Sequence, residues 1–281
     1  MADRPRDWRH WLLLTVAVVC LLNPRGIITA IVAMVVILPL AIEGVRGREA
    51  PFRWWATYVV TMTAFAYVRD IADMIVPVFV NYPIAIDRVL GFGAVPTVAL
   101  QSAFYSPGTP AWWDWLAIAV YVTHLPGIPV VGLVLWRRQS PRLRSLLLSA
   151  ALTSAAGVVV HVLLPTAPPW IAAQMGALPM VYRPMVDLLS QSAPGVYTYG
   201  LSVAGGNDVA AMPSLHAAMA TGIWFAARGT RLAWVGAVYA IAMWIALVYL
   251  GEHYVADVLA GAALMAWSWR TVSRSSRGPN S

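Results

Sequence analysis

The sequence predicts an all-α fold: a polytopic membrane helix bundle with a six-helix core and a short N-terminal hydrophobic hairpin. Three observations lead to this fold class. Hydrophobic residues make up 60% of the 281 residues and charged residues only 11%, which excludes an ordinary soluble domain. The apolar residues fall into long runs separated by polar loops. The basic residues are all arginines and gather in alternate loops, as expected for a chain that crosses a membrane repeatedly.

Eight apolar runs lie along the chain, at 11–22, 27–42, 54–68, 112–136, 145–164, 214–227, 232–250 and 254–269. A membrane span needs about 20 residues. The first two runs are short and are expected to form the N-terminal hairpin, while the last six are expected to form the core. The sequence therefore divides into the hairpin with a cytoplasmic loop (1–53), a membrane domain (54–270) and a disordered tail (271–281).

The arginines predict a topology. If the N-terminus is cytoplasmic and every run crosses once, the cytoplasmic side holds fifteen arginines and four acids. The other side then holds eight acids and only four arginines, which are Arg25, Arg69, Arg88 and Arg183. This asymmetry is typical of a membrane protein rather than a nucleic-acid-binding one, despite the net charge of +7. We expect an integral protein of a bacterial plasma membrane, with the stretches 69–111 and 165–212 forming interfacial helices and loops outside.

Two short clusters place histidines at the extracytoplasmic ends of apolar runs. The first reads Met-Pro-Ser-Leu-His at 212–216, and the second reads Gly-Glu-His-Tyr-Val-Ala-Asp at 251–257. Ionisable groups at membrane depth are costly, so such residues are functional candidates. The intervening chain fits one inward and one outward helix of similar length, which would bring His216 and His253 to the same face. The alternative is that these histidines only satisfy polar groups at helix ends.

The local pattern of each cluster predicts a chemical role. Pro213 is expected to be the first helical residue, because a helix start does not need its missing N–H. The amides of Ser214 and Leu215 would then be free for phosphate. Asp257 lies one turn beyond His253 and is expected to accept the Nδ1–H of that ring, which leaves Nε2 as a nucleophile.

These residues resemble the type 2 phosphatidic acid phosphatase superfamily of lipid phosphatases and phosphotransferases. Pro-Ser-Leu-His at 213–216 matches its PSGH motif except at Leu215, and His253 with Asp257 matches its HxxxD motif. Its Ser-Arg pair would fall on Ala246 and Leu247, and its lysine motif is absent because the chain has no lysine. These departures resemble the inositol phosphorylceramide synthase-like (inositolphosphotransferase) branch. So do the stretches Leu163–Trp170, Asp87–Leu90 and Pro96–Gln101, and the resemblance covers roughly residues 55–265.

The resemblance implies phosphoryl transfer through a phosphohistidine. His253 would attack phosphorus, Asp257 would orient it, and His216 would act as general acid and then base. Ser214 and Leu215 would help to bind the phosphate. A phospholipid and a hydroxyl acceptor are the expected partners in the bilayer, with no cofactor or metal, and the oligomeric state is left open. The alternatives are a phosphatase that uses water, a membrane transporter with proton-carrying histidines, and a metal site.

The absent Ser-Arg pair leaves the cation that holds the phosphate to be identified. Arg69 is the first candidate, with a salt bridge to Asp70 or Asp73 as its alternative role. Arg183 is the second candidate, and Arg88 is expected to pair with Asp87.

Three further polar residues are predicted to line a headgroup pocket: His124, His161 and Asn207. For the two histidines, hydrogen bonding within the bundle is the alternative. For Asn207, the alternative is an ordering role within its loop. Glu252 is expected to be interfacial and not catalytic.

Overall fold

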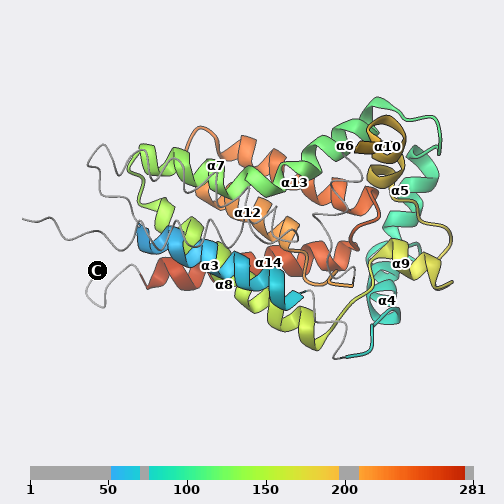
Figure 1. Cartoon of the computed structure of the whole chain (residues 1–281), viewed down its shortest axis with the longest axis horizontal. Helices are drawn as coiled ribbons and strands as arrows, with labels where there is room; N and C mark the ends of the chain where they lie inside the picture. The colour runs from blue at the N-terminus through green and yellow to red at the C-terminus, as the bar shows by residue number, and fades with distance from the viewer. Residues whose placement is uncertain (1–51, 70–75, 196–208, 276–281) are drawn as a thin grey trace, which may run out of the picture.

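The structure is a computed structural model and describes residues 52–69, 76–195 and 209–275 (Figure 1). Within these ranges the chain is helical, and its β-pairing is limited to isolated bridges. The expected hairpin at 11–22 and 27–42 lies outside the described residues. The last helix continues to Arg274, so the predicted tail is helical over its first residues.

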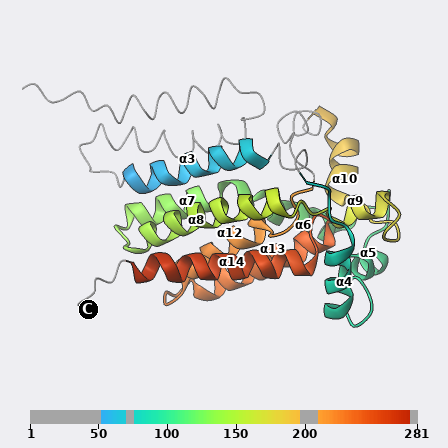
Figure 2. The ribbon, with the colours of Figure 1, turned by 90° about the horizontal axis from the view of Figure 1, so that it is seen from below.

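The longer helices lie side by side in a bundle (Figures 1 and 2). They are α3 (Phe52–Arg69), α6 (Trp112–Val122), α7 (His124–Arg137), α8 (Arg142–Leu163), α12 (Leu215–Ala227), α13 (Ala233–Tyr249) and α14 (Val255–Arg274). Helix α12 is central, because it packs against α7, α8, α13 and α14. Four short helices cover one end of the bundle: α4 (Asn81–Leu90), α5 (Pro96–Phe104), α9 (Pro169–Gln174) and α10 (Pro184–Ser192).

The bundle is held by large apolar side chains that meet small residues on neighbouring helices. Trp55 of α3 is fully buried beside Leu147 of α8 and belongs to the same core as Met265 of α14. A Cβ at Gly132 of α7 would lie 2.7 Å from the Trp55 ring. Small residues allow such close approach between apolar helices, where dispersion contacts supply the attraction.

The all-α class is confirmed, whereas the six-helix core stays a prediction. Among the described residues, Arg142–Leu163 alone is long and apolar enough to cross a membrane by itself, with a mean hydropathy of 2.1. Helices α12 and α13 are apolar but shorter.

The run 112–136 is broken, whereas the sequence predicts one span. Helix α6 ends at Val122, α7 begins at His124, and the segments Trp112–Val122 and Pro126–Arg137 are bent by 58°. Pro126 has no N–H to donate to the preceding turn, and proline is a common cause of sharp helix kinks. The break moves His124 from the middle of a predicted span to a helix terminus.

Candidate active site

The two histidine clusters meet at the end of the bundle that the short helices cover. His216 lies in the first turn of α12, and His253 directly precedes Tyr254, the N-cap residue of α14. Nδ1 of His216 lies 3.2 Å from Nε2 of His253. The inward and outward helices therefore bring together two rings that are 37 residues apart in the sequence.

The other nitrogen of His253 binds a backbone carbonyl. Its Nδ1 lies 3.0 Å from the oxygen of Ala211 and 3.6 Å from Oδ2 of the fully buried Asp257. Because a carbonyl oxygen only accepts hydrogen bonds, Nδ1 carries the proton and Nε2 is the unprotonated nitrogen of the neutral ring. His216 therefore donates from Nδ1 to this Nε2.

This arrangement differs from the predicted one in two respects. Ala211, rather than Asp257, takes the shorter contact with Nδ1, and Nε2 of His253 is bonded to His216 rather than free. Asp257 instead accepts from the amide of Tyr254 at 2.9 Å, and its Oδ1 has no hydrogen-bond partner among the described residues. Asp257 thus stands as a buried charge partner beside the ring.

The Ala211 carbonyl is held by a short extended segment. The amide of Thr166 donates to the oxygen of Val209 at 2.6 Å, and the amide of Ala211 donates to the oxygen of Thr166 at 3.1 Å. Phe79 pairs with the other side of the Thr166 segment. The stretch Leu163–Trp170, recognised in the sequence only by resemblance, therefore supports the group that orients His253.

The start of α12 corrects the prediction for Pro213. The helix begins at Leu215, and Ser214 is its N-cap, whose Oγ accepts from the amide of Ala217 at 3.3 Å. The Ser214 amide is not free, because it donates to the backbone oxygen of Asp257 at 3.0 Å. Serine is a preferred N-cap residue, and this preference fixes the helix start beyond the proline.

Two glycines allow the close packing around this helix start. A Cβ at Gly261 of α14 would lie 2.0 Å from the backbone oxygen of Ser214. A Cβ at Gly157 of α8 would lie 2.8 Å from Cδ2 of Leu215. Leucine thus stands where the superfamily motif has glycine, and a glycine on the neighbouring helix makes room for it.

Asp87 of α4 binds the N-terminus of α14. This fully buried carboxylate accepts from the amide of Ala256 at 2.9 Å and from that of Val255 at 3.1 Å. Burial raises the pKa of Asp87 to about 6, while the two amide bonds oppose the rise. Arg88 is exposed and does not take the partner role predicted for it. The sequence marked Asp87 only as part of a motif and gave no sign of this contact.

Arg183 pairs with Glu252, the residue before His253. Its Nε lies 3.1 Å from Oε1, and its Nη2 lies 3.2 Å from Oε2. The guanidinium also stacks on the ring of Trp170, with 4.1 Å to the centroid. Glu252 is therefore a specific partner of a candidate phosphate-binding residue rather than merely interfacial.

The loop that brings Glu252 to Arg183 depends on Gly251 and Gln101. Gly251 has φ of +78°, and a Cβ there would lie 2.7 Å from the oxygen of Tyr182. The Gln101 amide donates to the oxygens of Tyr249 and Tyr182, and its Oε1 accepts from the Tyr182 amide. These bonds join α5, the end of α13 and the segment that carries Arg183.

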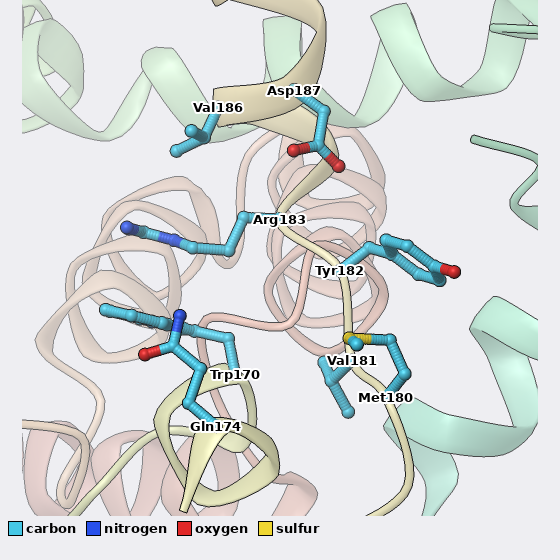
Figure 3. A pocket seen from close by; sticks show the side chains of 8 residues that line it. All are labelled: Trp170, Gln174, Met180, Val181, Tyr182, Arg183, Val186 and Asp187. Atoms are coloured by element: carbon cyan, nitrogen blue, oxygen red, sulfur yellow. The ribbon is translucent and has the colours of Figure 1, made fainter. Parts of the chain in front are cut away.

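A pocket of about 310 Å³ lies beside this ion pair (Figure 3). Its lining combines polar groups with apolar and aromatic side chains, from Trp170, Gln174, Met180, Val181, Tyr182, Arg183, Val186 and Asp187. Figure 3 shows the carboxylate of Asp187 and the amide of Gln174 on different sides of the pocket. The lining can therefore offer both hydrogen-bond donors and acceptors to a small polar group.

The remaining predicted site residues fall in three different places. His124, at the bend between α6 and α7, lies against the ring of His216 with 4.2 Å between centroids. His161, buried near the end of α8, has Nε2 3.1 Å from the oxygen of Pro213, so it supports the start of α12. The side chain of Arg69, at the end of α3, and the whole of Asn207 lie outside the described residues.

Comparisons with known proteins identify the superfamily of this chain. The sequence profile of the PAP2 superfamily matches residues 82–271, more than half of the chain. A phosphoinositol dihydroceramide synthase from Bacteroides thetaiotaomicron is 30% identical over 171 residues, which are 55% of this chain and 54% of that protein. The chain thus aligns with about half the length of this relative. No solved structure matches. The resemblance read from the histidine motifs is confirmed.

Proposed function

This chain belongs to the PAP2 superfamily, and from that membership we propose that it is a membrane phosphotransferase acting on a lipid phosphate ester. The enzyme moves a phospho-headgroup to a hydroxyl acceptor through a phosphohistidine. The contact of 3.2 Å between the two histidine rings carries this proposal, since it joins a nucleophile and an acid in one site.

His253 is the proposed nucleophile. Its Nδ1 proton is directed to Ala211 and Asp257, so its Nε2 lone pair is the one available to attack phosphorus. The bond to the leaving alcohol breaks as the bond to Nε2 forms. The negative charge of Asp257 stabilises the ring as it becomes positive.

His216 is the proposed general acid and base. It gives a proton to the leaving oxygen in the first step and takes one from the incoming hydroxyl in the second. In-line transfer requires the phosphoryl group to lie between the two rings. The direct hydrogen bond between them leaves no room for it. Substrate binding must therefore break this bond and separate the two rings.

Arg183 is the phosphate-binding cation that the described residues support best. Glu252 binds the edge of the Arg183 guanidinium that Nε and Nη2 form. The other edge, which includes Nη1, makes no hydrogen bond within the described chain and can bind a phosphate with two parallel bonds. The Ser214 hydroxyl and the Leu215 amide at the start of α12 are the other proposed phosphate contacts. Arg69 remains a second candidate.

The proposed headgroup is phosphoinositol, and the proposed acceptor is the hydroxyl of a second lipid. The name of the relative from Bacteroides thetaiotaomicron supports this choice. The polar pocket beside Arg183 has a suitable size and a mixture of donors and acceptors for a hydroxylated ring. His124 and His161, predicted to line the headgroup pocket, instead contact His216 and Pro213 in this structure.

The proposed location of the site is the extracytoplasmic face of a bacterial plasma membrane. The charge distribution supports this, because the arginines of the described loops gather at the opposite end of the bundle. Six membrane crossings by the core helices remain part of this proposal.

A headgroup-transfer assay tests the proposal. Purified protein in detergent receives phosphatidylinositol labelled in its headgroup, with ceramide or with water alone as acceptor, and with EDTA in a parallel sample. We expect labelled phosphoinositol ceramide, loss of product in His253→Ala and His216→Ala, and no effect of EDTA. Labelled inositol phosphate formed equally with and without ceramide would identify a hydrolase that uses water as the acceptor instead. Full activity of a folded His253→Ala variant would refute the phosphohistidine mechanism.

A further inference from the structure

The ring of His216 packs against two side chains from either side of the α6–α7 bend. Tyr121, near the end of α6, stacks on it with 5.2 Å between centroids and 30° between planes. His124, the first residue of α7, meets it edge to face, at 4.2 Å and 78°. The two contacts approach His216 in different orientations and come from one short segment.

The bend is what brings both side chains to the same ring. Nδ1 of His124 lies 2.6 Å from the backbone oxygen of Tyr121, so this nitrogen donates and fixes the orientation of the His124 ring. A Cβ at Gly127, one residue after Pro126, would lie 3.0 Å from Ile223 of α12. The first turn of α7 is therefore closely packed on the helix that carries His216.

We propose that Tyr121 and His124 form a seat for the His216 imidazole and that His124 is a positioning residue for proton transfer to the leaving oxygen. This inference rests on the proposed function, in which His216 is the general acid. When substrate separates His216 from His253, the ring loses its hydrogen bond to that partner. The seat then holds the ring toward the leaving group, and the π face of Tyr121 is a favourable neighbour for a protonated ring.

The proposed role of the seat predicts an effect on catalysis that residues with a purely structural role would not show. A proton from His216 matters for an alkoxide leaving group, which is strongly basic, and matters little for nitrophenolate, which is weakly basic. Loss of the seat should therefore slow substrates with alcohol leaving groups selectively. General damage to the fold should slow both kinds of substrate equally.

Two inositol phosphodiesters with different leaving groups provide the test. Phosphatidylinositol releases diacylglycerol, and 4-nitrophenyl inositol phosphate releases nitrophenolate. The full-length protein and each variant are assayed for kcat and KM on both substrates. Because His216 is also the base of the second step, the two substrates are compared by kcat/KM, which reports the first step, in which the leaving group departs. His216→Ala is the reference variant and should lose about a hundredfold or more in kcat/KM on phosphatidylinositol, with a much smaller loss on the nitrophenyl ester.

His124→Ala should lose about tenfold in kcat/KM on phosphatidylinositol, a fraction of what a general acid contributes, and less than about twofold on the nitrophenyl ester. His124→Phe keeps an aromatic ring and should recover part of the loss. Equal losses of His124→Ala on both substrates, or no loss on either, would overturn the seat. Equal losses of His216→Ala on both would instead refute the proposed acid role of His216 itself.

Discussion

The two ends of the helix bundle differ in the charged residues that they carry. At the end where α7 meets α8, the described chain carries nine arginines and no acid, and most of these arginines are exposed. The arginines of this end are Arg53, Arg137, Arg138, Arg142, Arg144, Arg228, Arg231, Arg270 and Arg274. The histidine end carries all five described acids, and each has a specific partner.

The partners at the histidine end are of several kinds. Asp87 binds backbone amides, and Asp257 lies beside a histidine. Glu252 pairs with an arginine. Asp114 accepts from Tyr249 and Asp187 accepts from Tyr105. Three of these acids are buried, namely Asp87, Asp114 and Asp257. Burying a charge is costly unless it is paired, so the histidine end is the end where substitutions should matter.

The largest effect after the catalytic histidines is expected for Gly261→Ala. Its Cβ would meet the backbone oxygen of Ser214 at 2.0 Å and push α14 away from the start of α12. We expect a loss of transfer activity of about a hundredfold or more, since small displacements of reacting groups carry penalties of that size. Gly195→Ala is the matched control, because a Cβ there meets nothing within 4 Å. Comparable activities of the two variants would show that α14 tolerates the shift.

A direct comparison of the two ends comes from Arg183→Gln and Arg231→Gln. Each removes one positive charge, but Arg183 is bound to Glu252 beside the nucleophile, whereas Arg231 is exposed at the opposite end. Loss of a charged partner from a substrate phosphate should raise KM by about ten- to a hundredfold in Arg183→Gln, corresponding to about 1.5–3 kcal/mol. Arg231→Gln should stay within about twofold. A normal KM for Arg183→Gln would move the phosphate-binding role to Arg69.

The smallest effect is a pH dependence of stability from Asp87. Its pKa in the folded protein is about 6, above the ordinary 3.8, so the folded state binds this proton more tightly. The resulting stabilisation is complete below pH 4 and is lost as the pH rises through 6, by at most about 3 kcal/mol. Charge on Asp257 adds to the rise in pKa.

Asp87→Asn has no proton to lose and should not show this decline. Thermal unfolding in detergent between pH 4.5 and 7.5 measures the difference between the two proteins. Parallel pH profiles would mean that Asp87 is ionised throughout this range in the folded state.

The sequence predicted the parts of the site that follow from local pattern and topology. Two apolar runs of similar length with a turn between them return to the same face, so the meeting of His216 and His253 could be foreseen. The sequence predicted that α12 begins at Pro213, but the helix begins at Leu215. The preference of Ser214 for the N-cap position exceeded the preference of Pro213 for the first turn.

The remaining contacts depend on tertiary packing that leaves no periodic signal in the chain. Asp87 reaches Val255 across 168 residues, and Arg183 reaches Glu252 across 69. The bend after Tyr121 lies within an apolar run whose composition fits an unbroken span. Pro126 is the residue in the sequence that could have indicated this bend.

The central claim is that the nucleophile is His253, and a trapped intermediate tests it most directly. Protein is mixed with 4-nitrophenyl inositol phosphate labelled with ³²P, quenched in alkali within one turnover, and digested for mass spectrometry. The account predicts a label that survives alkali, is lost in acid, and maps to His253. The label should persist in His216→Ala and be absent in His253→Ala. Turnover without any labelled protein, or a label on another residue, would contradict the account.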